Sequence, residues 1–241
     1  MMSEQSKRSA PFAKSSPTCI VIRWLPMPLV AAALLSIVGC SGAADSPPSE
    51  QVESTSQELY VLSTNVWDDN QISVCWETGG FNRQKGWVRT AIENTWQRFS
   101  QLEFTGWGSC AVSGGANIRI AIADQNPRTL GLGSDLDHVR NGMLLDFTFR
   151  NWSPACQNQV EYCIRAIAVH EFGHALGFAH EQNRADTPDT CDQAPQGSNG
   201  DTTVGDWDAM SVMNYCNPRY NNDGNLSQTD IAGLQQYYGQ P

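Results

Sequence analysis

From about residue 59 onward, apolar positions recur at helix and strand spacings. Over residues 85–99, intervals of four, four and three residues predict a helix with one apolar face, made by Val88, Ile92, Trp96 and Phe99. Strand-like apolar runs lie at residues 72–77, 102–107, 117–124 and 142–149. The order strand, helix, strand, strand, strand predicts a mixed sheet with a helix packed on it, which is an α+β fold.

The second half of the chain predicts two further helices separated by loops. Residues 161–177 are apolar on most sides, which indicates a buried helix. Residues 182–225 are loop-rich, and a last helix begins at Ser227, where Ser227 can cap the helix and Asp230 favours its positive end. The tryptophans of the first half, Trp76, Trp87 and Trp96, are interpreted as core rather than as a ligand site.

The N-terminus has the layout of a secretory signal. Basic residues precede an apolar run of about 15 residues that leads into the sequence IVGC, ending at Cys40. The run is shorter than the roughly 20 residues needed to cross a bilayer. IVGC resembles the bacterial lipobox, so residues 1–39 are expected to be removed and Cys40 acylated. The alternative is an N-terminal helix that stays attached as an anchor.

Residues 40–58 are rich in Ser, Pro and Glu and predict a flexible tether before a folded domain at 59–241. The whole chain has a net charge of −10; losing residues 1–39 removes four basic residues and one acidic one, which leaves −13. Nucleic acid is therefore not expected as a partner, since phosphate binding needs a basic face. We expect an exported monomer, either secreted or attached to the cell envelope through Cys40.

Cysteine usage agrees with export. Apart from Cys19 and Cys40, six cysteines remain, and an even number in an exported domain indicates up to three disulfides with 15 pairings open. Short or motif-bracketing loops favour Cys75–Cys110, Cys156–Cys163 and Cys191–Cys216. Cysteine metal ligands are the weaker alternative, because no CxxC pair occurs.

Three of the four histidines lie in HEFGHALGFAHEQNR, residues 170–184. On a helix, His170 and His174 are one turn apart on the same face and can bind one zinc ion. Gly177 tolerates the left-handed conformation that would turn the chain back and deliver His180 as a third ligand. Three protein ligands leave a position for water, as in catalytic zinc sites. The fourth histidine, His138, is interpreted as an ordinary core or surface residue.

Glu171 favours a catalytic site over a structural one. It follows the first ligand at about 100° around the helix, so it can approach the open coordination position without filling it. A structural zinc would usually close the fourth position with Cys or His and has no use for Glu171. Bound zinc lowers the pKa of its water toward about 7, and Glu171 is the candidate general base.

The extended motif HEFGHALGFAHEQNRAD resembles the zinc signature of the metzincin peptidases, and most of all that of the astacin family. Glu181, Arg184 and Asp186 stand at the astacin spacing after the third histidine. DWDAMSVMNY (206–215) resembles the Met-turn, which implies that Met213 forms a hydrophobic floor beneath the zinc. The final segment, 226–239, is similar to the last helix of the clan, closer to the matrixin branch.

The resemblance implies a twisted sheet and the zinc helix in an upper subdomain, then a cleft and a smaller lower subdomain from about residue 181. It implies that Tyr215 can ligate zinc and stabilise the transition state. Two departures stand out. Asn214 replaces a histidine found in many astacins, and no inhibitory propeptide motif is evident. In astacins the freed N-terminus pairs with the Glu after the third His; here Glu181 bonds internally, or a second cleavage occurs in 41–58.

The sequence therefore predicts a zinc-dependent endopeptidase acting on proteins or peptides, with zinc held by His170, His174 and His180. Two alternatives stay open. One is a surface binding module with a catalytically silent zinc, and the other is a matrixin-branch peptidase. The latter would add structural calcium, for which Asp192, Asn199 and Asp201 are weak candidates, since that loop is more simply solvated.

Overall fold

The computed structural model describes residues 59–241, with residue 114 left out. The predicted signal, the lipidation site at Cys40 and the tether lie outside the described residues. In the described part no helix is both long and apolar enough to cross a membrane.

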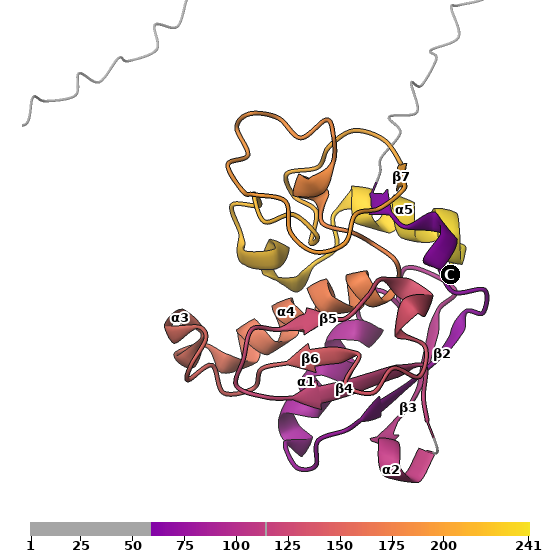
Figure 1. Ribbon diagram of the computed structural model, residues 1–241, viewed down its shortest axis with the longest axis vertical. Coiled ribbons are helices and arrows are strands. Elements are labelled where there is room, and N and C mark those ends of the chain that lie inside the picture. Colours follow the sequence, from indigo (N-terminus) through magenta and orange to yellow (C-terminus); the bar gives the residue numbers. More distant parts are fainter. Residues whose placement is uncertain (1–58, 114) are drawn as a thin grey trace, which may run out of the picture. The chain divides into compact units, whose positions relative to one another are not determined.

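A five-stranded sheet forms the first half of the domain (Figure 1), in the order β3-β2-β4-β6-β5. Strands β3, β2, β4 and β6 are parallel, whereas the edge strand β5 runs antiparallel to β6. The bounds are β2 Gln71–Trp76, β3 Glu103–Ser109, β4 Ile118–Ile122, β5 Arg128–Thr129 and β6 Met143–Leu145. The predicted mixed sheet is confirmed, and the strand at 142–149 is shorter than predicted. The Asp146 carboxylate accepts from the backbone N–H groups of Thr148 and Phe149, and this local turn ends the strand.

Two helices pack together beside this sheet, α1 (Asn82–Glu93) and α4 (Val160–Ala175). Helix α1 begins earlier and ends earlier than the predicted 85–99. Its apolar face nevertheless extends past its end, because the fully buried Trp96 donates its indole N–H to the Val169 carbonyl of α4 at 2.8 Å. Trp76 is also buried, while Trp87 is half-buried against the same core.

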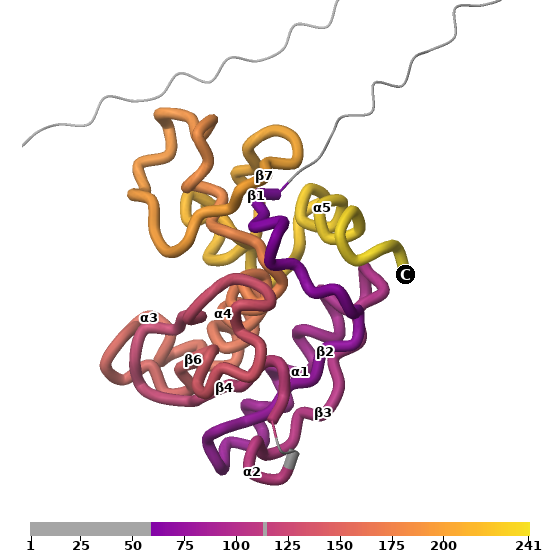
Figure 2. Tube along the Cα trace, turned by 45° about the vertical axis from the view of Figure 1, so that its right-hand side comes forward, coloured from indigo at the N-terminus to yellow at the C-terminus, as the bar shows by residue number. Residues whose placement is uncertain are grey.

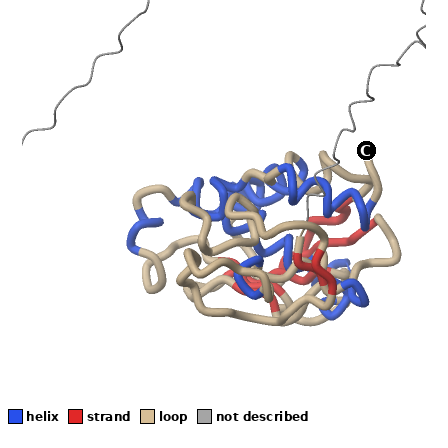
Figure 3. The backbone as a smooth tube through the Cα atoms, turned by 90° about the horizontal axis from the view of Figure 1, so that it is seen from above, coloured by secondary structure: helices blue, strands red, loops and turns tan. Residues whose placement is uncertain are grey.

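The chain after α4 is mostly loop, as predicted. Figure 3 shows the loops of the described chain in tan, between the helices and strands. A second, two-stranded sheet pairs β1 (Tyr60–Val61) with β7 (Thr202–Thr203), so the start of the described chain lies beside this loop region (Figure 2). The remaining short elements are η1 Ser63–Asn65, α2 Cys110–Ser113, η2 Gly133–Leu136, α3 Pro154–Gln157, η3 Glu181–Asn183 and η4 Tyr220–Gly224. Two-residue strands are too short to show a hydrophobic period, which is why β1, β5 and β7 were not predicted.

The last helix, α5 (Gln228–Tyr238), begins as predicted. Ser227 caps it: the Ser227 hydroxyl accepts from the Asp230 N–H, and the Asp230 carboxylate accepts from the Ser227 N–H. All three favoured disulfides are present, Cys75–Cys110, Cys156–Cys163 and Cys191–Cys216. The Cys191–Cys216 bond joins two parts of the loop region after α4, which stabilises a region with little regular structure.

Candidate metal centre and cleft

The chain turns sharply at the end of helix α4, and this turn brings His180 back to His170 and His174. Gly177 has φ +95°, and the N–H groups of Gly177 and Phe178 bond to the carbonyls of His174 and Gly173. These two bonds form a Schellman motif, in which a glycine takes the left-handed position just past the helix end. The predicted role of Gly177 in turning the chain is confirmed, and His180 follows three residues later.

The three histidines converge through one nitrogen each. The Nε2 atom of His180 lies 3.1 Å from the Nε2 atoms of both His170 and His174. Each Nδ1 atom lies 2.7–2.9 Å from a backbone carbonyl, contributed by Val212, Phe178 and Gln196. A carbonyl only accepts, so each Nδ1 carries the proton and each Nε2 presents a lone pair. Three lone pairs facing one another are unfavourable unless a cation lies among them.

The residues fit a zinc ion. Zinc–nitrogen bonds of 2.0–2.1 Å in a tetrahedron place two ligand nitrogens roughly 3.3 Å apart, close to the spacing found here. Among the described residues, these three histidines form the one group of three or more His, Cys, Asp or Glu that could hold a metal ion. Burial lowers the pKa of all three imidazoles, that of His170 to about 3, so they are neutral and ready to bind a metal at neutral pH.

The fourth histidine, which the sequence indicated to be an ordinary core or surface residue, is not part of this centre. His138 is exposed and lies 3.6 Å from the carboxylate of Asp137. In the loop considered for calcium, Asp201 accepts from the Ser63 N–H and Asn199 accepts from the Asn183 amide. Asp192 accepts from the Gln193 amide. One oxygen of each candidate thus accepts from a protein donor, and no calcium site is proposed there.

Glu171 is buried beside the centre and lines both hollows that open onto it. Burial raises the pKa of its carboxyl to about 8 in the metal-free chain, and Arg128 lowers it by a smaller amount. One carboxylate oxygen, Oε2, is buried without a hydrogen-bond partner among the described residues. A buried carboxylate of this kind is costly unless a proton or cation accompanies it.

The raised pKa of Glu171 gives a pH-dependent prediction for stability. Between pH 4.5 and 8 the folded metal-free chain keeps a proton on Glu171 that the unfolded chain has released, so this group makes stability fall as pH rises. Glu171→Gln removes the effect. We therefore expect the metal-free variant to gain stability relative to wild type as pH rises, by roughly a few kcal/mol across the window.

Urea unfolding of both metal-free proteins at a series of pH values measures this difference. Glu161→Gln, an exposed change on the same helix, provides the control and should leave a flat difference. A difference for Glu171→Gln that is constant with pH would contradict the assigned shift.

Met213 and Val212 contact the part of helix α4 that carries His170 and His174. Met213 is fully buried, and its sulfur lies so close to Gly173 that a Cβ there would overlap it. The Val212 carbonyl orients His170, and the Met213 carbonyl accepts from the Glu181 N–H at 2.9 Å. The turn predicted at 206–215 therefore contacts both the first ligand and the residue after the third.

Glu181 bonds internally, one of the two possibilities left open by the sequence. Its Oε1 atom accepts from the Arg184 guanidinium at 3.0 Å and from the Asp208 N–H at 3.2 Å. Arg184 also bonds to Asp186 at 2.7 Å, so the three residues of the extended motif form one network. Glu181 and Arg184 are both buried, and this ion pair fixes the loop that follows the third ligand.

Asp230 has a role at this site that sequence reasoning missed. Beyond capping α5, its carboxylate accepts from the Ser211 hydroxyl at 2.7 Å and the Val212 N–H at 2.9 Å. Asp230 is fully buried, and burial raises the pKa of its carboxyl to about 6. It therefore connects the last helix to the turn beneath His170, a link between residues 18 apart that no local pattern reveals.

We expect Asp230→Asn to destabilise the fold by about 2–4 kcal/mol. The amide has one accepting oxygen, and when that oxygen faces the Val212 and Ser227 N–H groups, the NH₂ group replaces the atom that accepts from the Ser211 hydroxyl. Ser227→Ala, which removes only the cap, should cost about 1 kcal/mol. Denaturant unfolding compares the two. Equal losses would contradict the link from Asp230 to the turn.

Tyr215, in the loop region after α4, places its ring against the rings of His170 and His180. Its ring stacks on His170 at 5.3 Å between centroids and lies 4.5 Å from His180. Burial and the nearby Glu171 raise the pKa of its phenol, so the hydroxyl keeps its proton at neutral pH and can donate. Gln182 accepts from the Tyr215 backbone N–H, which ties this residue to the third-ligand loop.

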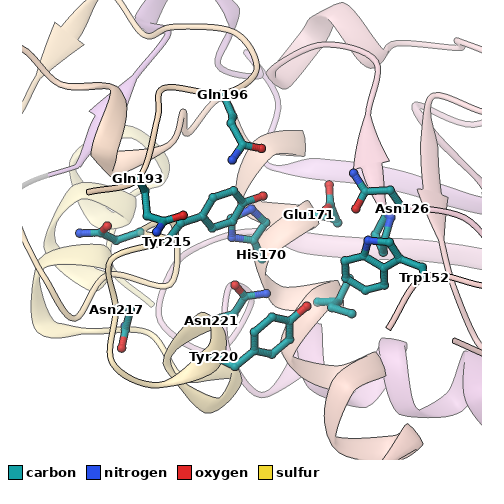
Figure 4. A pocket seen from close by; sticks show the side chains of 13 residues that line it. Asn126, Trp152, His170, Glu171, Gln193, Gln196, Tyr215, Asn217, Tyr220 and Asn221 are labelled. Atoms are coloured by element: carbon teal, nitrogen blue, oxygen red, sulfur yellow. The ribbon is translucent and has the colours of Figure 1, made fainter. Parts of the chain in front are cut away.

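Two adjoining hollows meet at the metal centre. One, of about 350 Å³, lies on the His170 side (Figure 4). The other, of about 270 Å³, lies on the side of His174 and His180 and follows residues 126–132, which include β5. Both include Asn126, Pro127, Glu171, Gln196 and Tyr215 in their lining. The hollows thus form one cleft that crosses the metal centre and runs along the sheet edge.

Residues 157–239 match the family model for the astacin peptidases, about a third of the 241-residue chain. A solved structure of myroilysin is similar, with a TM-score of 0.55 and 18% identity over 75% of this chain and 98% of that one. A second myroilysin crystal structure gives a TM-score of 0.52 and 19% identity over 76% of this chain and 89% of that one. A comparison with curated proteins found no match.

The fold is similar to that of the two myroilysin structures, and within it the three convergent histidines could hold one metal ion. The family match adds that residues 157–239 are similar to the astacin peptidases, and the matched segment includes the last helix, α5. The metal ligands and the turn fall within the matched segment, whereas the sheet lies before it.

Proposed function

We propose that this protein is a zinc endopeptidase in which Glu171 is the general base. The observation that carries the proposal is the position of Glu171: a buried carboxylate, unsatisfied at one oxygen, next to three histidines that present their lone pairs to one point. His170, His174 and His180 would hold the zinc. When bound, the ion polarises the substrate carbonyl and lowers the pKa of water.

The chain's own residues supply the proton transfers. Glu171 takes the proton of the attacking water and passes it to the leaving amine, as general base and then general acid. The Tyr215 phenol, which keeps its proton, donates to the oxygen that gains negative charge in the transition state. The three backbone carbonyls that bond to the Nδ1 atoms keep the imidazoles oriented throughout.

Strand β5 offers a place for an extended peptide. It is the last strand of the sheet, so within the described part of the chain one side of its backbone is not paired with another strand. Residues 126–132 line the cleft. A peptide can add to such an edge through main-chain hydrogen bonds, with its side chains entering the hollows. A cleft that continues on both sides of the metal centre supports cleavage within a chain.

Export is part of the proposal. Three disulfides in one domain are typical of an oxidising compartment, which supports an exported protein. Lipid attachment through Cys40 would then retain it at the cell envelope. Mass spectrometry of the mature N-terminus distinguishes an acylated Cys40 from a cut elsewhere in 41–58.

The rival function is a surface binding module with a silent zinc. Digestion of casein by the zinc-loaded chain, with and without a chelator, separates the two. The peptidase degrades casein only when zinc is present, and a binding module leaves it intact in both conditions. Intact casein with zinc bound in full would overturn the proposed activity.

A further inference from the structure

The three carbonyls that orient the imidazoles are held in different ways. The Val212 carbonyl belongs to a turn that is bonded to the last helix, and the Phe178 carbonyl follows a helix end closed by backbone bonds. The carbonyl that accepts from His180 belongs to Gln196. Residues 192–199 contain no helix or strand, and none of their backbone groups bonds to another backbone group in the described chain. Gln196 therefore depends on side chains for its position.

The side-chain amide of Asn183 binds both backbone groups of Gln196. Its Oδ1 atom accepts from the Gln196 N–H at 2.9 Å, and its Nδ2 atom donates to the Gln196 carbonyl at 2.7 Å. The Nδ2 atom also donates to Asn199 Oδ1 at 3.0 Å. Asn183 itself lies in η3, three residues after His180, and its backbone N–H bonds to the His180 carbonyl at 3.1 Å. One side chain thus ties the third histidine to the segment that orients it.

The segment that Asn183 holds lies against the ring of His180. The Gln196 carbonyl is 2.9 Å from His180 Nδ1. Gly197 follows with φ +68°, and a Cβ at that position would lie 3.6 Å from the same nitrogen, which is an ordinary contact distance. Gln196 and Gly197 also line the smaller hollow, and Figure 4 shows the Gln196 side chain at the cleft. A shift of this segment would therefore reach the metal centre directly.

The Gln196 carbonyl decides which nitrogen of His180 faces the metal position. Because a carbonyl only accepts, it keeps the proton on Nδ1 and leaves the lone pair on Nε2. Without this partner the neutral ring can carry its proton on Nε2 instead, or rotate away from His170 and His174. Outer partners of metal-bound histidines contribute about 10–100-fold to metal affinity or activity. The side chain that holds this carbonyl should therefore affect the zinc affinity.

We propose that Asn183 is a positioning residue that acts through the Gln196 carbonyl to keep the His180 lone pair directed at the metal position. This role rests on the proposed zinc peptidase and adds a residue, outside the three histidines, on which the metal centre depends. Asn183 itself lines neither hollow and is not one of the converging side chains. Its removal should therefore weaken zinc binding without taking away any group that touches the ion or the substrate.

Asn183→Ala tests this role through the zinc dissociation constant of the full chain. A chromophoric chelator competes with the metal-free protein for zinc at neutral pH. We expect the variant to bind zinc roughly tenfold more weakly than wild type, since the carbonyl that orients His180 is no longer held. Asn199→Ala is the matched control, because it removes only the Asn183–Asn199 bond and leaves both bonds to Gln196 in place. It should bind zinc within about twofold of wild type.

Asn183→Leu gives a second variant, which fills a similar space without a donor or an acceptor. It should weaken zinc binding about as much as Asn183→Ala does, because both lack the bonds to Gln196. Urea unfolding of the metal-free proteins, at the pH of the affinity measurement, reports their stability in the absence of zinc. A residue with a merely structural role would lower that stability and leave the zinc affinity of the folded protein unchanged.

Zinc binding by either variant within about twofold of wild type would overturn the positioning role of Asn183. Loss of the metal-free fold in both variants would overturn it as well, because the role would then be structural. In both cases the proposed peptidase would stand, since the wild type still binds zinc and degrades casein. A wild-type chain that binds no zinc would instead overturn the proposed peptidase, and the role of Asn183 with it.

Discussion

Glu171→Gln should retain zinc and lose almost all peptidase activity. Glutamine keeps the shape and the hydrogen-bonding reach of the side chain but cannot accept the proton of the attacking water. General base catalysis contributes about 10²–10⁴ in rate, so we expect kcat to fall by a factor in that range. The proposed ligands are the three histidines, so the metal content should stay at one zinc per chain.

The measurement pairs turnover of a fluorogenic peptide with metal analysis of the same sample. Glu161→Gln is the matched control, because Glu161 lies on the same helix but is exposed and paired with Arg165. It should retain full activity. An active Glu171→Gln protein would remove Glu171 from the mechanism, and loss of zinc on substitution would show that Glu171 acts as a ligand instead.

Removing the metal should abolish activity and loosen the fold together. The three proposed ligands come from α4 and from the loop after it, and their Nε2 atoms lie close together, so their lone pairs face one another when no cation is bound. At a zinc concentration about 1,000 times the dissociation constant, binding stabilises the fold by about 4 kcal/mol. For a domain of this size that corresponds to a Tm change of roughly 10 °C.

Chelation, followed by thermal unfolding and an activity assay, measures both effects, and added zinc should reverse them. His174→Ala should behave like the chelated protein, whereas His138→Ala changes an exposed histidine outside the triad and should behave like wild type. A Tm that does not respond to zinc would contradict the metal centre. A zinc-dependent Tm without peptidase activity would favour the silent binding module.

Much of the architecture could be predicted because local spacing carries it. The buried helix at 161–177, the capped last helix at Ser227 and most strands have a hydrophobic period or a capping pattern that a few neighbouring residues define. The histidine motif is local as well: helix geometry places His170 and His174 together, and Gly177 turns the chain through bonds within six residues.

Other features depend on residues far apart in sequence. The edge strand β5 has only two residues. It is a strand because it pairs with β6, and it belongs to the site because it lies along the hollow beside the metal centre. The predicted end of α1 lies too far along the chain. Trp96 is buried against α4, where its indole N–H bonds to a backbone carbonyl, although it lies beyond the end of α1. The spacing of apolar residues cannot distinguish such a buried residue from one further turn of helix. The sequence predicted a helix-start role for Asp230, but its bond to the turn below His170 joins segments that no local pattern connects.

The sequence by itself indicated the metal-binding chemistry. It supplies three histidines, helix geometry places His170 and His174 on one face, and Gly177 permits the left-handed turn that brings His180 to them. It also favoured the three disulfides that the structure contains. Only the tertiary structure decided the partners of Glu181, the link through Asp230 and the bonds from Asn183 to Gln196. Those depend on contacts between segments that the chain brings together only when it buries its core, and no local pattern encodes them.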